Sequence, residues 1–216
     1  MTSSAADPAP GNPGRSLGER FDPQSWSGAL AIMAALAGVL WVVEIVNIVD
    51  DYSLDRFGLK PRVVDGLDGV ITMPLLHAGA GHLLANTFPF IIIGWMVLIG
   101  GVREFLLATA VIVVGGGLAT WLVGPSGTVV GASALVFGWL GYLLARAYFA
   151  RKLTWIIAGV FALFSFGGLF GGLLPSVRSG VAWQAHLCGL VAGIAAGWVL
   201  HPRKGSARAL RREGTP

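Results

Sequence analysis

The chain is far more apolar than a soluble domain. Of its 216 residues, 55% are hydrophobic and only 12% are charged, and the mean hydropathy is +0.73, whereas soluble domains carry about 25% charged residues. The formal net charge of +4 comes mostly from residues outside the apolar runs, so it reports membrane orientation rather than a nucleic-acid-binding surface. This composition excludes a soluble protein and a nucleic-acid partner, and it predicts an integral protein of the lipid bilayer.

The two ends of the chain differ in composition from the middle. Residues 1–26 are rich in Pro, Gly, Ser and Ala and are expected to form a disordered cytoplasmic tail. They do not resemble a signal peptide, because they contain Asp7, lack an early basic region and precede an apolar run that is too long. Residues 201–216 are basic and are expected to form a second cytoplasmic tail, which leaves residues 27–200 as the membrane domain.

Six apolar runs are long enough to cross about 30 Å of hydrocarbon as helices. They lie at 27–49, 82–101, 105–123, 132–149, 154–173 and 182–200. Helix is the expected conformation because a transmembrane helix satisfies its own backbone hydrogen bonds within lipid. The predicted fold is therefore an all-α membrane bundle of six transmembrane helices.

The basic residues predict the orientation of this bundle, since six spans put both termini on one side. Eleven of the 15 Lys and Arg residues fall on the side of the termini: Arg15, Arg20, Arg103, Arg146, Arg151, Lys152, Arg203, Lys204, Arg208, Arg211 and Arg212. The other side has Arg56, Lys60, Arg62 and Arg178. Because basic loops stay in the cytoplasm, both termini are expected there, in a bacterial plasma membrane.

Three of the predicted spans place polar side chains at one depth. The second, fourth and sixth spans all run inward from the outer face, and their first turns hold His82 and Asn86, Ser133, and His186. At 1.5 Å rise per residue, these side chains lie within about 10 Å of the outer boundary. The glycines Gly189, Gly193 and Gly197 form a stripe near His186 that allows a neighbouring helix to approach closely. If that neighbour is the fourth span, the His186 imidazole can reach Ser133.

These residue types suit acyl transfer. A serine hydroxyl becomes a nucleophile when a neutral histidine takes its proton, and the developing oxyanion needs hydrogen-bond donors. His82, the Asn86 amide and the Ser133 N–H are candidate donors, helped by the positive end of the fourth helix. Because the spans hold no Asp or Glu placed to orient His186, the arrangement is a Ser–His dyad rather than a triad.

Each of these residues also has a simpler interpretation. A serine in a membrane helix commonly bonds its own backbone, and glycine stripes commonly serve packing alone. His77, His82 and His186 could bind a metal, but no carboxylate or thiolate stands at a suitable spacing, so we expect no metal and no cofactor. The lone Cys188 has no disulfide partner. Glu44, within the first span and one turn before Asn47, is interpreted as structural, either paired inside the bundle or reaching the interface.

At this point the sequence resembles the rhomboid family. His77-Ala-Gly-Ala-Gly-His82-Leu-Leu-Ala-Asn86 is similar to the two histidines and asparagine that open its second helix. Gly131-Ala-Ser133 followed by Phe137-Gly138 resembles its nucleophile motif, and Ala185-His186-Leu-Cys-Gly189-Leu-Val-Ala-Gly193 resembles its sixth-helix histidine motif. The three motifs occur in the order of the family, and the resemblance covers roughly residues 27–200.

The resemblance implies an intramembrane serine protease that cleaves transmembrane substrates near the outer end of their helices. It assigns Ser133 as the nucleophile and His186 as the general base. It builds the oxyanion hole from His82, Asn86 and the backbone N–H groups of Ala132 and Ser133, supported by His77, Gly131 and Phe137. A protein that binds transmembrane helices without cutting them is the alternative, and the oligomeric state stays open. A transporter or channel is disfavoured because the spans have almost no charged residues.

Three features depart from the family pattern. Ala134 follows the serine where glycine is usual, and its methyl group is expected to crowd the oxyanion hole. Asp68-Gly69 occupies the region where a Trp-Arg pair often anchors the first outer loop. Gly124-Pro125-Ser126-Gly127 matches the usual Gly-x-Ser-Gly pattern better than the motif around Ser133 does. We reject Ser126 as the nucleophile because Pro125 favours a turn and no helix with Phe and Gly at the right offsets follows.

Overall fold

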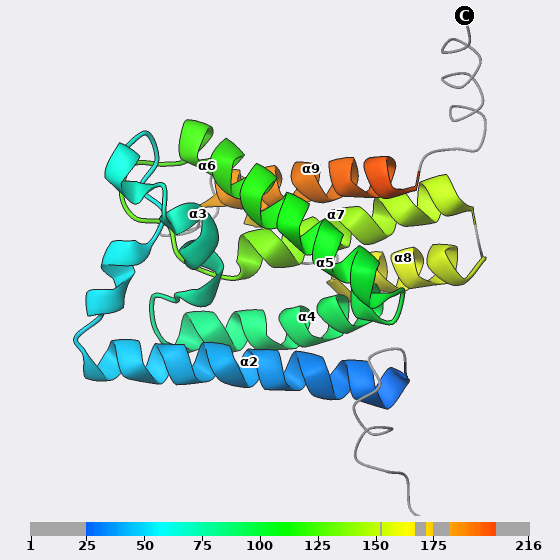
Figure 1. Ribbon diagram of the computed structural model, residues 1–216, viewed down its shortest axis with the longest axis horizontal. Helices are drawn as coiled ribbons and strands as arrows, with labels where there is room; N and C mark the ends of the chain where they lie inside the picture. The colour runs from blue at the N-terminus through cyan, green and yellow to red at the C-terminus, as the bar shows by residue number, and fades with distance from the viewer. Residues whose placement is uncertain (1–24, 152, 167–171, 175–181, 202–216) are drawn as a thin grey trace, which may run out of the picture.

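The computed structural model describes residues 25–151, 153–166, 172–174 and 182–201. Within these ranges the chain forms helices joined by loops (Figure 1). The long helices are α2 (Trp26–Val49), α4 (Ala80–Leu98), α5 (Val102–Val111), α6 (Gly117–Val123), α7 (Ser133–Ala150), α8 (Leu153–Phe166) and α9 (Trp183–Leu200). A π-helical turn, η4 (Ile112–Gly116), joins α5 and α6 into one continuous rod.

The six predicted spans each coincide with a helical segment, which confirms the all-α membrane bundle. Four segments are long and apolar enough to cross a membrane: Trp26–Val49, Ala80–Leu98, Val102–Val123 and Trp183–Leu200. Helices α7 and α8 are apolar but shorter over their described residues. The end of the span expected at 154–173, Arg178 and most of the two predicted tails lie outside the described residues.

Three predicted span boundaries are wrong by two or three residues, and one of them is the end of the second span, expected at residue 101 and found at Leu98. The helices expected to begin at residues 82 and 105 begin at Ala80 and Val102. Gly79 and Gly101 precede them with φ values of +111° and +135°, a region that favours glycine, so each helix starts directly after its glycine turn. Glu104, which the sequence placed outside the third span, therefore lies in the first turn of α5.

Helix α7 packs against α9, α8, α4 and α5. Its side chains Trp139, Leu140 and Tyr142 are fully buried. A Cβ atom at Gly189 or Gly193 of α9 would overlap backbone atoms of α7, so these glycines let the two backbones touch. The fourth and sixth spans are therefore in contact, which is the condition under which the sequence lets the His186 imidazole reach Ser133.

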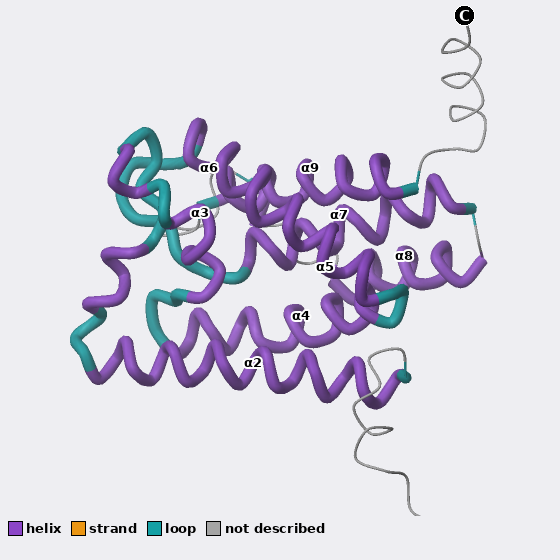
Figure 2. The backbone as a smooth tube through the Cα atoms, in the orientation of Figure 1, coloured by secondary structure: helices purple, strands orange, loops and turns teal. Residues whose placement is uncertain are grey.

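Helices α4, α7 and α9 all begin at the same end of the molecule, on the left of Figure 1. The loops that precede α4 and α7 lie at this end as well (Figure 2). The connection between α2 and α4 contains four short helical turns, namely η1 (Ser53–Phe57), η2 (Val64–Gly66), α3 (Gly69–Thr72) and η3 (Met73–Leu75). We call residues 50–79 the outer loop and residues 124–132 the nucleophile loop.

The outer loop is held against α6 and the nucleophile loop by hydrogen bonds. The adjacent Trp-Arg pair that often anchors this loop in the family is not needed for these contacts. Leu59 and Val129 form an antiparallel bridge, with hydrogen bonds of 3.0 and 2.8 Å. The Arg62 guanidinium donates to the carbonyl oxygen of Gly124 at 2.7 Å, and the Trp121 indole donates to Val63 at 2.8 Å. Here the arginine and the tryptophan come from separate segments, and together they anchor the loop that leads to Ser133.

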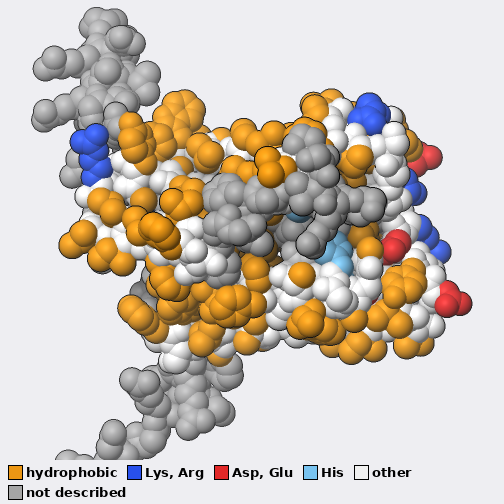
Figure 3. Space-filling view, turned by 180° about the vertical axis from the view of Figure 1, so that it is seen from behind, with side chains coloured by type: hydrophobic (Ala, Val, Ile, Leu, Met, Phe, Trp, Pro, Cys, Tyr) orange, Lys and Arg blue, Asp and Glu red, His pale blue; other side chains and the backbone are white. Residues whose placement is uncertain are grey.

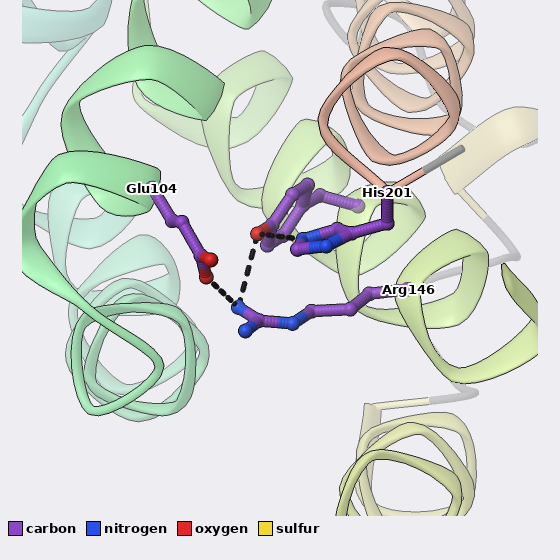
Figure 4. A network of polar contacts seen from close by, with 4 residues as sticks. Glu104, Arg146 and His201 are labelled. Atoms are coloured by element: carbon purple, nitrogen blue, oxygen red, sulfur yellow. Dashed lines mark hydrogen bonds and ion pairs between the residues drawn. The ribbon is translucent and has the colours of Figure 1, made fainter. Parts of the chain in front are cut away.

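A group of polar side chains meets near the C-terminal end of α7, around Arg146 (Figure 4). Arg146 pairs with Glu104 of α5, with 2.5 Å between Nη1 and Oε2, and donates to the Tyr142 hydroxyl at 3.0 Å. That hydroxyl lies 3.0 Å from His201 Nε2, and the guanidinium sits 3.6 Å from the Trp155 ring centroid. These contacts join α5, α7, α8 and the residue that follows α9.

Seen from behind, the molecule carries hydrophobic side chains across its middle, whereas its charged side chains gather at the ends (Figure 3). The exposed hydrophobic residues of α2 include Val39, Val42 and Ile45, and those of α8 include Ile157, Phe161 and Phe164. Apolar side chains in such numbers on an outer surface are expected of helices that face lipid. The chain is therefore a multi-pass membrane protein.

Candidate active site

Ser133 and His186 meet across the contact between α7 and α9. Ser133 is the first residue of α7, and His186 lies in the first turn of α9. The Oγ atom of Ser133 lies 2.9 Å from Nε2 of His186, which is hydrogen-bond distance. The two side chains that the sequence proposed as a dyad are thus in direct contact.

The backbone carbonyl of Gly172 determines which nitrogen of His186 carries the proton. Nδ1 lies 2.9 Å from the Gly172 oxygen, and a carbonyl oxygen can only accept, so Nδ1 is the protonated nitrogen. Nε2 is then an acceptor that faces the Ser133 hydroxyl, as a general base requires. Gly172 therefore takes the orienting position that a carboxylate holds in a triad.

Sequence reasoning missed Gly172 because any residue has a backbone carbonyl. A weak signal exists in the residue type, since a Cβ atom at this position would lie 3.0 Å from Nδ1 of His186. Phe137, one turn after Ser133, packs against the face of the His186 ring. Its ring stacks on the imidazole with centroids 4.5 Å apart and planes 18° apart, as the motif implied.

His82 of α4 lies beside the turn that leads into Ser133, and Asn86 lies one turn further along the same helix. A Cβ atom at Gly131 would come within 2.8 Å of the His82 ring and 3.6 Å of Ser133 Oγ, so His82 lies against this turn. Gly131 also has a φ of +127°. Both this backbone conformation and the nearby His82 ring therefore favour glycine at the position. Asn86 donates one amide hydrogen to the carbonyl of His82 at 3.0 Å, and within the described part of the chain this is the hydrogen bond that its amide nitrogen makes, which leaves a second hydrogen to donate.

His77 is completely buried next to His82, with ring centroids 5.3 Å apart. Its Nε2 accepts the N–H of Ala132 at 3.2 Å. Burial, with a smaller effect from His82, lowers the pKa of His77 to about 4, so the ring is neutral at pH 7. The Ala132 N–H, which the resemblance assigned to the oxyanion hole, is therefore engaged by His77 in this structure.

The structure shows the surroundings of Ala134 and Ser126, the two departures from the family pattern that lie near Ser133. Ala134 is buried in an apolar cluster with Leu59, Val70, Met73, Val129 and Ala185, so its methyl group has hydrophobic neighbours. Ser126 is exposed in the nucleophile loop, whereas Ser133 begins a helix and contacts a histidine. Among the described residues, no group of three His, Cys, Asp or Glu side chains is arranged to hold a metal ion.

Comparison with known proteins agrees with this arrangement. The family model for the rhomboid domain matches residues 66–203, a range that includes every site residue discussed above. The chain belongs to the rhomboid family.

Mycobacterial proteins are relatives of this rhomboid. Uncharacterized protein Rv1337 of Mycobacterium tuberculosis is 42% identical over 195 residues, which cover 87% of this chain and 81% of the relative. Uncharacterized protein Mb1372 of Mycobacterium bovis has the same identity and coverage. Uncharacterized protein ML1171 of Mycobacterium leprae is 37% identical over 196 residues, covering 87% of this chain and 77% of the relative.

Proposed function

We propose that this rhomboid is an intramembrane serine protease that cleaves transmembrane helices near the extracytoplasmic side by a Ser133–His186 dyad. The observation that carries the proposal is the 2.9 Å contact between Ser133 Oγ and His186 Nε2. The Gly172 carbonyl supports it, because it leaves Nε2 free to accept a proton.

In the proposed reaction Ser133 Oγ attacks the scissile carbonyl carbon while its proton moves to His186 Nε2. The substrate oxygen becomes an oxyanion at the N-terminal end of α7, where unpaired backbone N–H groups and the helix dipole favour negative charge. The Ser133 N–H, the second Asn86 amide hydrogen and the His82 ring are the proposed donors. The Ala132 N–H could join them only if its bond to His77 opened.

When this intermediate collapses, the carbon–nitrogen bond breaks and His186 gives its proton to the leaving amine. Water then attacks the acyl-enzyme, with His186 again taking and returning a proton. The positive-inside distribution supports cytoplasmic termini, which would place this chemistry near the outer face.

Cleavage of a generic transmembrane substrate by the purified protein in detergent tests the proposal. The wild-type protein should cleave, whereas Ser133→Ala and His186→Ala should each remain folded and inactive. A wild-type protein that binds transmembrane helices without cutting any of them would instead favour the non-proteolytic alternative.

A further inference from the structure

Helix α2 carries two buried polar side chains on an otherwise apolar surface. Glu44 is 1% exposed and Asn47 is 0% exposed. This helix lies before residues 66–203, the part that matches the family model. An ionisable side chain inside a membrane helix is costly, so Glu44 calls for an explanation beyond lipid contact.

Asn47 connects the end of α2 to the residues that lead into the site. Its Nδ2 donates to Asp55 at 3.0 Å and approaches the His77 carbonyl oxygen at 3.5 Å. Its Oδ1 accepts the Leu54 N–H at 3.0 Å. Asn47 thus touches the backbone of His77, whose ring holds the N–H of Ala132, the residue just before Ser133.

Glu44 lies on α2, one turn before Asn47, and next to the start of α4. Its carboxyl group adjoins the N–H of Gly79 and the Asn47 side chain, but both of its oxygens are buried and neither reaches hydrogen-bond geometry within the described residues. Helix α4 has no side-chain cap of its own, and its N-cap is Gly79. The first N–H groups of a helix need acceptors, and an acidic group from α2 is placed to supply one.

Helix α4 in turn carries His82 and Asn86 in its first two turns, and α2 packs against α4 along its length (Figure 1). We propose that Glu44, together with Asn47, is a positioning residue of the site, which holds the first turn of α4 and thereby sets His82 and Asn86 opposite Ser133. This inference rests on the proposed function and extends it to the first span.

The test compares Glu44→Leu with Glu44→Gln, which keeps a hydrogen-bonding group, and with Ile45→Ala, a matched control at a position that is 54% exposed on the same helix. Glu44→Leu should lower kcat at least about tenfold with little change in KM, because it disturbs donors to the oxyanion rather than substrate binding. Glu44→Gln should keep kcat within about threefold of the wild-type value, and Ile45→Ala should have the same kcat as the wild type.

Two further readouts separate positioning from simple loss of stability. In an Asn86→Ala background, Glu44→Leu should change kcat by less than about twofold, because residues that act through one another are not additive. Hydrogen exchange of the amides of residues 80–84 should be faster in Glu44→Leu than in Ile45→Ala, and the thermal midpoint should hardly move.

An equal loss of kcat in both backgrounds, or unchanged exchange at residues 80–84, would overturn the inference. The exchange measurement needs no substrate. A wild-type protein that fails to cleave would therefore count against the proposed function alone, while exchange would still decide the role of Glu44.

Discussion

His186 Nε2 lies 2.9 Å from Ser133 Oγ because Gly189, one turn after His186, removes the side chain that would otherwise separate α9 from α7. A Cβ atom at Gly189 would overlap the backbone of Ala134, the residue next to the serine. The glycine stripe and the contact between Ser133 and His186 are therefore parts of one arrangement: close helix packing brings the imidazole to the hydroxyl.

Removing the Asn86 amide should lower turnover far more than binding. If its second amide hydrogen donates to the oxyanion, Asn86→Ala loses a contact made mainly in the transition state. One such donor is worth about 2.7–4 kcal/mol, or roughly 100- to 1000-fold in kcat. Steady-state kinetics in detergent would measure kcat and KM, and thermal denaturation would measure stability. Near-normal turnover in a strongly destabilised variant would instead assign Asn86 a structural role through its bond to His82.

Ala134→Gly should leave the proposed proteolytic turnover nearly unchanged. The methyl group packs in the apolar cluster that contains Leu59 and Met73, so its removal costs packing and helix propensity, about 2 kcal/mol together. We expect a small drop in the thermal midpoint and kcat within about twofold of wild type. A large rise in kcat would show that the methyl group crowds the oxyanion hole, as the family pattern suggested.

His77 should make folding stability depend on pH. Its pKa is about 4 in the folded protein against the ordinary 6.5, so between these values the unfolded chain binds more protons. Stability is therefore complete above pH 6.5 and falls as the pH drops towards 4, by at most about 3 kcal/mol from this residue.

His77→Gln isolates that contribution, because glutamine offers an acceptor to Ala132 but does not titrate in this range. His82 and His186 are present in both proteins, so their titration cancels in the comparison. Thermal midpoints measured from pH 7 to pH 4 should fall less steeply in His77→Gln. Parallel curves would show that His77 is not the residue whose protonation opposes folding.

Cleavage should release the extracytoplasmic part of a substrate. The basic residues predict cytoplasmic termini, and Ser133, the first residue of α7, lies at the opposite end of that helix from Arg146. A model transmembrane substrate tagged at both ends, with its cut site determined by mass spectrometry, measures the depth. A cut near the cytoplasmic end of the substrate helix would refute the predicted orientation.

The residues that the sequence proposes for the site are those whose type and helical position carry a signal. His82, Asn86, Ser133 and His186 are polar residues at the starts of apolar runs, and helix geometry is enough to place them in one layer. The bundle itself followed from the lengths of the runs, because lipid leaves helices as the main way to satisfy the backbone.

Contacts made by the backbone or by loops could not be predicted in this way. The Gly172 carbonyl that orients His186 and the Ala132 N–H held by His77 depend on where loops pass, and hydropathy does not record loop paths. Similarly, Arg62 and Trp121 are far apart in sequence, so their joint anchoring of the outer loop became visible only in the folded chain.

Mapping the covalent adduct of a fluorophosphonate probe tests the central claim most directly, because the probe reacts with an activated serine hydroxyl. We predict one adduct on Ser133 in the wild-type protein and in Ser126→Ala. Ser133→Ala should take up no probe, and His186→Ala should react much more slowly because its serine lacks a base. Labelling at Ser126, or labelling of Ser133 at the same rate without His186, would contradict the proposed dyad.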